Sequence, residues 1–171
     1  MASALKNLSE YDDTNIPEAA DMKFGIVVSE WNKEITHALY QGCIDTLLKH
    51  GAKEENIQQS QVPGSFELPA AARWMANAKD VDAVICLGCV IKGETSHNEY
   101  INNTVAAALM NLSLAMNKPF IFGVITPNTL QQAQDRAGGK HGNKGVEAAV
   151  TAIRMVHTKT ELEKPKKKIG F

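Results

Sequence analysis

Short apolar runs alternate with longer amphipathic segments over most of this chain, beginning near Met22. The apolar runs have the length of buried strands, and the longer segments repeat apolar residues at the spacing of one helical face. Strands are expected at 23–29, 57–62, 83–91 and 120–125, and helices at 34–50, 68–78 and 144–156. Helical sequence also follows the third and fourth strands, so strand and helix alternate throughout.

The segment 34–50 illustrates the helical pattern, and Gly51 supplies its C-terminal stop. Four strands separated by helices need crossover connections, which are right-handed and give a parallel sheet covered on both faces. The expected fold class is therefore α/β: a three-layer α/β/α sandwich with a flavodoxin-like, four-stranded parallel sheet.

The 171 residues suit one compact domain, which the pattern places at 22–158. Residues 1–21 are polar and predict a flexible N-terminal arm, and residues 159–171 form a basic tail. The tail lysines fit a polyanion-binding arm or, as we favour, a solvated terminus. Elsewhere basic and acidic residues are interspersed, with a net charge of -1, so neither a nucleic-acid nor a membrane partner is expected.

The cysteine content and the N-terminal sequence indicate the cellular compartment in which the protein is expected. No apolar run reaches membrane-spanning length and no signal-peptide pattern is present, so a cytoplasmic location is expected. Three cysteines, an odd number, fit free thiols. Cys86 and Cys89 match the CxxC spelling of redox and zinc motifs, but they lie inside a strand-like run without a second ligand pair. A thiol oxidoreductase is therefore a minor alternative, and no metal site is predicted.

The ends of the predicted strands carry most of the candidate chemistry. Ligands of parallel α/β sheets bind outside the carboxyl ends of the strands, so the four strand exits are expected to form one pocket. The exits cover residues 29–32, 63–67, 93–97 and 126–128. Together they bring aromatic, acidic, hydroxyl and imidazole groups to one edge of the sheet.

Three of these side chains have specific candidate roles. Trp31 could stack on a planar heterocycle or pack against the next helix, and Glu67 could bind a ligand N–H or simply face a helix dipole. His97 follows a turn in which Thr95 and Ser96 expose backbone N–H groups, where an anion could dock. Because histidine titrates near neutral pH, His97 is the candidate general acid or base.

Glycines and cations are mixed between Arg136 and Gly145, a combination found in anion sites. Arg136 suits bidentate contact with a phosphate. The segment is not a Walker A loop, because the glycine spacing and a Ser or Thr after Lys144 are absent. The end of one helix and the start of the next explain the glycines equally well.

Five ordered motifs together resemble the lumazine synthases, which make 6,7-dimethyl-8-ribityllumazine in riboflavin biosynthesis. The matching segments are 24–32, 62–69, 88–97, 122–126 and 132–138 with 142–145. The resemblance implies condensation of 5-amino-6-(D-ribitylamino)uracil with 3,4-dihydroxy-2-butanone 4-phosphate. The reaction would pass through an imine, lose phosphate, and close the ring with loss of water, without a metal or an organic cofactor.

The same resemblance implies roles for individual residues. His97 would move protons during imine formation and elimination. Residues that stack on the ribitylaminouracil, hold its ribityl chain or line its ring would bind this substrate: Trp31, Ser65, Phe66, Glu67, Cys89, Val90, Ile91 and Phe122. Phe122 would come from a neighbouring subunit. The butanone phosphate would be bound by the backbone N–H groups of Glu94 and Thr95 and by the Arg136 guanidinium.

The family assembles as homopentamers, and some members pack twelve pentamers into an icosahedral shell that can enclose a riboflavin synthase. The short segment 138–145 resembles the corresponding segment of the shell-forming members, so a shell is favoured.

Two residues depart from the usual family pattern: Glu94 stands where a small residue is usual, and Asn98 stands where an aromatic residue is usual. Both differences put the affinity for the phosphate in question. The alternative is a non-catalytic flavin-binding or scaffold protein of the same fold.

Overall fold

Four parallel strands form the central sheet of the computed structural model, which describes residues 10–164. They are β1 (Phe24–Ser29), β2 (Ile57–Val62), β3 (Ala83–Cys89) and β4 (Phe120–Ile125), in the order β2-β1-β3-β4. Phe24 pairs with Ile57 on one side and with Ala83 on the other, and Val84 pairs with Phe120. The parallel sheet predicted from the alternation of elements is confirmed.

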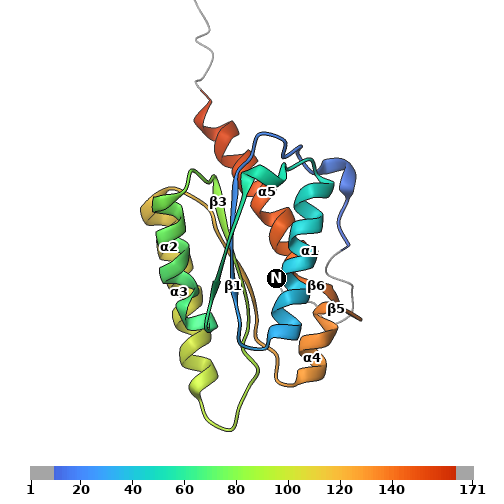
Figure 1. The fold of residues 1–171 in the computed structure, drawn as a ribbon, viewed down its shortest axis with the longest axis vertical. Helices are drawn as coiled ribbons and strands as arrows, with labels where there is room; N and C mark the ends of the chain where they lie inside the picture. The colour runs from blue at the N-terminus through green and yellow to red at the C-terminus, as the bar shows by residue number, and fades with distance from the viewer. Residues whose placement is uncertain (1–9, 165–171) are drawn as a thin grey trace, which may run out of the picture.

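Helices cover both faces of this sheet, as Figure 1 shows. On one face lie α2 (Leu68–Ala78) and α3 (His97–Met116), and on the other α1 (Lys33–Lys49) packs against α5 (Lys144–Glu163). The short α4 (Leu130–Asp135) continues into an antiparallel pair, β5 (Ala137–Gly139) and β6 (Gly142–Asn143), before α5 begins. Three short 3-10 turns, η1 (Asp13–Asn15), η2 (Glu54–Asn56) and η3 (Ser65–Glu67), complete the elements. The α/β/α sandwich is thus confirmed.

The core divides into two clusters, one on each face of the sheet. Phe24, Ile26 and Val28 contribute to the cluster under α1 and α5, whereas Val27 contributes to the one under α2 and α3. This alternation is the two-residue period of a strand. Strands β1 and β3 are central and buried along their whole length, which explains their continuous apolar runs.

The ends of two elements differ from the sequence expectation, and part of the N-terminal segment packs against the fold. The third strand ends at Cys89 and not at 91, although Val90 N–H still donates to the Ile125 carbonyl at 2.9 Å. Helix α5 runs to Glu163, so the first residues of the expected tail are helical. In the N-terminal segment, Ala19 is fully buried and its N–H donates to the His50 carbonyl at 2.8 Å.

The domain limits at 22 and 158 stay predictions. The tail lysines after Lys164 lie outside the described residues. Within residues 10–164, no helix has the length and apolar content needed to cross a membrane.

Candidate active site

A cavity of about 490 Å³ opens at the carboxyl edge of the sheet, the lower end of the molecule in Figure 1. Its volume is in the range of small-molecule sites. Residues from the exits of β1, β2 and β3 line it, but residues 126–128 do not. The prediction that all four exits share one pocket is therefore wrong for the fourth. Strand β4 is an edge strand, and the chain after it leads to α4, whose Ala133 packs on the opposite face of the sheet.

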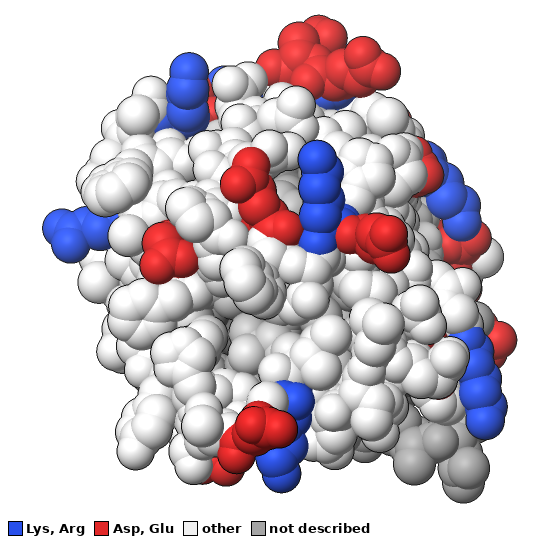
Figure 2. All heavy atoms as spheres, turned by 60° about the horizontal axis from the view of Figure 1, so that its bottom comes forward, with Lys and Arg blue, Asp and Glu red and all other residues white. Residues whose placement is uncertain are grey.

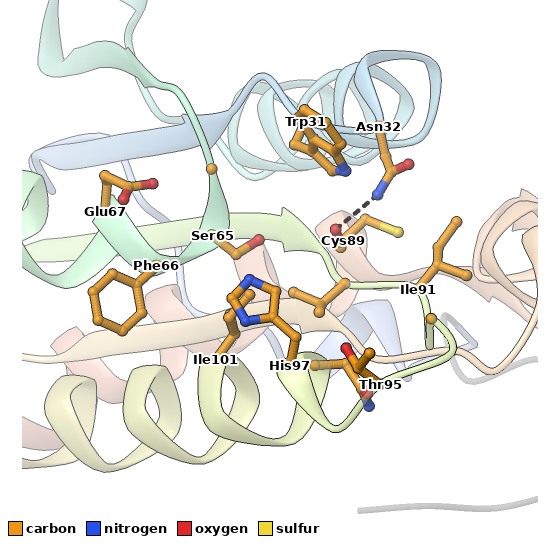
Figure 3. Close-up of a pocket in the computed structure, with 14 residues that line it drawn as sticks. Trp31, Asn32, Ser65, Phe66, Glu67, Cys89, Ile91, Thr95, His97 and Ile101 are labelled. Atoms are coloured by element: carbon orange, nitrogen blue, oxygen red, sulfur yellow. Dashed lines mark hydrogen bonds between the residues drawn. The ribbon is translucent and has the colours of Figure 1, made fainter.

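The walls of the cavity come from different elements, as Figure 3 shows. In that view Trp31 and Asn32 lie on one side, Thr95 and His97 lie on the other, and Cys89 lies between them. Trp31 has 73% of its surface exposed, so a face of its indole is free to stack on a ligand. Its backbone N–H donates to the Pro63 carbonyl at 3.1 Å, which ties the first strand exit to the second.

The second exit is the turn η3, which sits closely on β3. Ser65 is buried, and its hydroxyl lies 3.5 Å from that of Ser29. Phe66 and Glu67 are exposed and line the cavity, and Glu67 immediately precedes α2. Gly88 lies beneath this turn, and its missing side chain allows the close approach.

The floor of the cavity, Cys89 to Ile91, is apolar and uncharged. Burial raises the pKa of the Cys89 thiol to about 12, so the thiol is protonated at neutral pH. Cys86 and Cys89 belong to the core clusters on opposite faces of the sheet, and both are free thiols. This placement rules out the CxxC pair as a dithiol redox centre and confirms the sequence interpretation that set it aside.

The third exit offers a cluster of unused backbone donors. Among the described residues, the N–H groups from Gly93 to Ser96 have no protein acceptor. They lie immediately before α3, a twenty-residue helix whose positive dipole end favours an anion. Thr95 and His97 line the cavity, whereas Glu94 is exposed and does not. An anion beside His97 would therefore meet the backbone of this turn.

Phe122 and Arg136 lie away from the cavity of their own chain. Phe122 is on the edge strand β4 and lines a separate groove of about 670 Å³ between α3 and α5. Arg136 follows α4, and its guanidinium donates to the His141 carbonyl at 2.8 Å and to the Glu147 carboxylate at 2.7 Å. One chain thus brings nine of the predicted site residues together but leaves Glu94, Phe122 and Arg136 outside.

Five further lining residues had no binding or catalytic role in the sequence prediction: Asn32, Gly64 and Gly93, which lie within the predicted strand exits, and Asn98 and Ile101, which lie on α3. Ile101 follows His97 by four residues, so helical spacing could have identified it. Asn32 follows Trp31 directly, but an Asn before a helix is ordinarily explained as its cap.

Charge is sparse around this end of the molecule. Figure 2, which turns the lower end of Figure 1 toward the viewer, shows mostly uncharged surface with separate acidic and basic side chains. Within residues 10–164, no group of three His, Cys, Asp or Glu side chains is placed to hold a metal ion. Charge recognition at the cavity therefore depends on individual groups and on the backbone.

Comparison with known proteins gives a consistent result. The family model described as 6,7-dimethyl-8-ribityllumazine synthase matches residues 21–160. A protein of that name from Parabacteroides distasonis is 54% identical over 157 residues, which cover 92% of this chain and 98% of the relative. One from Cytophaga hutchinsonii is 56% identical over 156 residues, covering 91% and 98%. One from Phocaeicola vulgatus is 51% identical over 164 residues, covering 96% and 98%.

Proposed function

Because this chain belongs to the 6,7-dimethyl-8-ribityllumazine synthase family, we propose that its strand-exit cavity condenses 5-amino-6-(D-ribitylamino)uracil with 3,4-dihydroxy-2-butanone 4-phosphate. The chain is a transferase of riboflavin biosynthesis. One observation carries the assignment of the reaction to this cavity: residues of three motifs, far apart in sequence, line one space of suitable volume.

The pyrimidine ring of the ribitylaminouracil fits between Trp31 and the floor at Cys89 to Ile91. The exposed indole supplies a stacking face, and the protonated Cys89 thiol leaves the floor neutral. Ser65, Phe66 and Glu67, on η3, are the residues for the ribityl chain and nearby polar groups. Glu67 is exposed at the cavity, where its carboxylate can accept hydrogen bonds from ligand donors.

The butanone phosphate fits at the third exit, with its phosphate on the N–H groups of Glu94 and Thr95. The free donors before α3 support this placement. The aminouracil amine is already a nucleophile, so holding the two substrates together supplies much of the rate. Imine formation and phosphate elimination both need proton transfer, and His97, exposed at the cavity, is the group that performs it.

The remaining two site residues act from a neighbouring copy of the chain. Phe122 and Arg136 do not line the cavity of their own subunit. Phe122 lines the groove between α3 and α5, and Arg136 is paired with Glu147 on α5. Met110, Leu114 and Met155 are exposed along the groove that Phe122 lines. Exposed apolar surface of this kind marks interaction sites. A homopentamer that buries this groove therefore completes each cavity with Phe122 and Arg136 from the next subunit.

We place the pentamer in an icosahedral shell, because the connection between α4 and α5 is short and contains only the β5–β6 pair. A riboflavin synthase is the proposed enclosed partner. Three free, buried thiols suit the reducing cytoplasm. Light scattering decides the assembly: a mass five times the 18.6 kDa of one chain, and no larger species, would exclude the shell.

The reaction is tested by mixing purified protein with both substrates and following lumazine absorbance and fluorescence against an uncatalysed control. Accelerated product formation is expected. A folded, assembled protein that binds riboflavin but gives no acceleration would favour a flavin-binding or scaffold role.

A further inference from the structure

Asn32 connects two walls of the cavity by a hydrogen bond between distant parts of the sequence. Its side-chain Nδ2 donates to the carbonyl oxygen of Cys89 at 3.0 Å, the dashed line in Figure 3. The bond joins the residue after Trp31 to the last residue of β3. It therefore links the stacking wall to the floor.

The backbone of Asn32 is unusual for the cap of a helix. Asn32 is the N-terminal cap of α1, but its φ of 60° and ψ of 47° are left-handed and its side chain does not cap the helix. A capping Asn normally has an extended backbone and accepts from N–H groups of its own helix. Here the carbonyl of Asn32 accepts from the Ile35 and Thr36 N–H groups at 2.9 and 3.1 Å, and the amide is left to reach β3.

The backbone around Trp31 is held to β2 more firmly than to β3. Glu30 and Trp31 donate to the carbonyls of Val62 and Pro63 at 2.8 and 3.1 Å. The pairing of β1 with β3, by contrast, ends at Val28 and Leu87, before either wall of the cavity. The Asn32 amide thus continues the connection to β3 beyond the end of the strand pairing.

We propose that Asn32 is a positioning residue of this site. Its amide holds the Trp31 wall against the floor formed by Cys89 to Ile91, so that a planar pyrimidine ring meets both walls in a fixed geometry. The inference rests on the proposed function, because it takes these two walls as the site of the ribitylaminouracil. Asn suits the position because it tolerates a left-handed backbone and carries an N–H donor.

Two substitutions separate these requirements. Asn32→Gly keeps the left-handed backbone but removes the amide, and Asn32→Asp keeps the shape but replaces the donor by a carboxylate that cannot donate. Asn117→Gly is the matched control, because Asn117 is also left-handed, with a φ of 46°, and its amide donates to Glu163 at 3.3 Å at the far end of α3.

Steady-state kinetics give the first measurement. Loss of one hydrogen bond that orders the binding wall is expected to raise KM for the ribitylaminouracil about tenfold in both Asn32 variants. KM for the butanone phosphate and kcat at saturation are expected to stay within about twofold, because the third exit is unchanged. Asn117→Gly is expected to match the wild type in all three quantities.

Tryptophan fluorescence gives a second measurement without substrate. The chain has two tryptophans, so in a Trp74→Phe background the emission comes from Trp31. Asn32→Gly and Asn32→Asp are expected to lower the anisotropy of Trp31 in the ligand-free protein, whereas Asn117→Gly is not. A side chain that only contacted the substrate would not change this signal.

The outcomes separate this inference from the proposed function. Wild-type KM and anisotropy in Asn32→Asp would overturn the positioning role, even if Asn32→Gly failed to fold. Equal increases in both KM values would also overturn it, since they would indicate a general structural effect. If the wild type makes no lumazine but the anisotropy change is present, the proposed function fails while the role of Asn32 in holding Trp31 stands.

Discussion

A methyl group added at Gly88 tests whether the turn η3 must lie as close to β3 as the structure has it. The Cβ of an alanine at this position would lie 2.5 Å from the Ser65 hydroxyl oxygen and 3.0 Å from the Leu68 Cδ1 atom. Ordinary van der Waals contact begins near 3.4 Å, so the Ser65 oxygen must move by about 1 Å. Ser65 and Leu68 are both buried, so the displaced atoms have little free space. We expect Gly88→Ala to lower the free energy of unfolding by about 1–3 kcal/mol.

The same displacement reaches the cavity, because Ser65 begins the turn that carries Phe66 and Glu67. A shift of about 1 Å in a binding group can cost as much as ~100-fold in rate. We therefore expect KM for the ribitylaminouracil to rise more than KM for the butanone phosphate.

Urea unfolding at one chain concentration and steady-state kinetics measure these two effects. Gly93→Ala is the control for stability, because a Cβ there meets no atom within 4 Å, and its unfolding free energy should stay within about 0.5 kcal/mol of the wild type. Wild-type stability and kinetics in Gly88→Ala would refute the reasoning.

Three further predictions concern the reacting groups, the thiols and the half-buried His50. His97→Ala is expected to lower kcat by about 10²–10⁴-fold with little change in either KM. Arg136→Ala is expected mainly to raise KM for the butanone phosphate. Unchanged steady-state kinetics in both variants would remove these assignments. Cys86 and Cys89 are expected to resist alkylation in the native protein and to react in urea, because burial raises the pKa of both thiols. Mass spectrometry counts the alkylated cysteines, and rapid labelling of the native protein would contradict their burial. Burial lowers the pKa of His50 below its usual 6.5, so its contribution to stability is complete above that pH and is lost as the pH falls below it. Urea midpoints across this range should fall less steeply with acidification in His50→Gln than in the wild type.

The strands show how far hydrophobic pattern determines structure. The second and fourth strands lie where the pattern placed them, at Ile57–Val62 and Phe120–Ile125. The third was predicted two residues too long, because Val90 and Ile91 are apolar but line the cavity instead of continuing the ladder. An apolar run in the sequence indicates that its residues are shielded from water, but it does not distinguish residues inside a sheet from residues that line a cavity.

Helix α5 was predicted too short for the opposite reason. Its last turns carry mostly polar residues and an exposed Leu162, so no apolar periodicity marks them. Intrinsic helix preference continues the helix where pattern gives no signal.

The candidate site was predictable where it depends on strand exits and not where it depends on strand order. The motifs identified Trp31, Glu67 and His97, which line the cavity. Only the sheet order shows that β2 and β4 lie at opposite edges; the cavity takes the exits of β2, β1 and β3, and the chain after β4 leads away to α4 on the other face of the sheet. The ion pair of Arg136 with Glu147 also had no sequence signal, because it forms only when the β5–β6 pair turns the chain back on itself.

Mixing two impaired variants, at a butanone phosphate concentration so far below the KM of Arg136→Ala that this variant is nearly inactive, tests most directly the central claim, that this cavity is a lumazine-forming site shared between chains. His97→Ala and Arg136→Ala proteins are unfolded together, refolded and assayed for lumazine formation. If His97 of one chain acts with Arg136 of its neighbour, about a quarter of the sites in a random mixture carry both groups, and activity returns to that fraction of the wild type. Mixed assemblies that stay as inactive as either variant alone, while wild type refolded in the same way is active, would contradict the account.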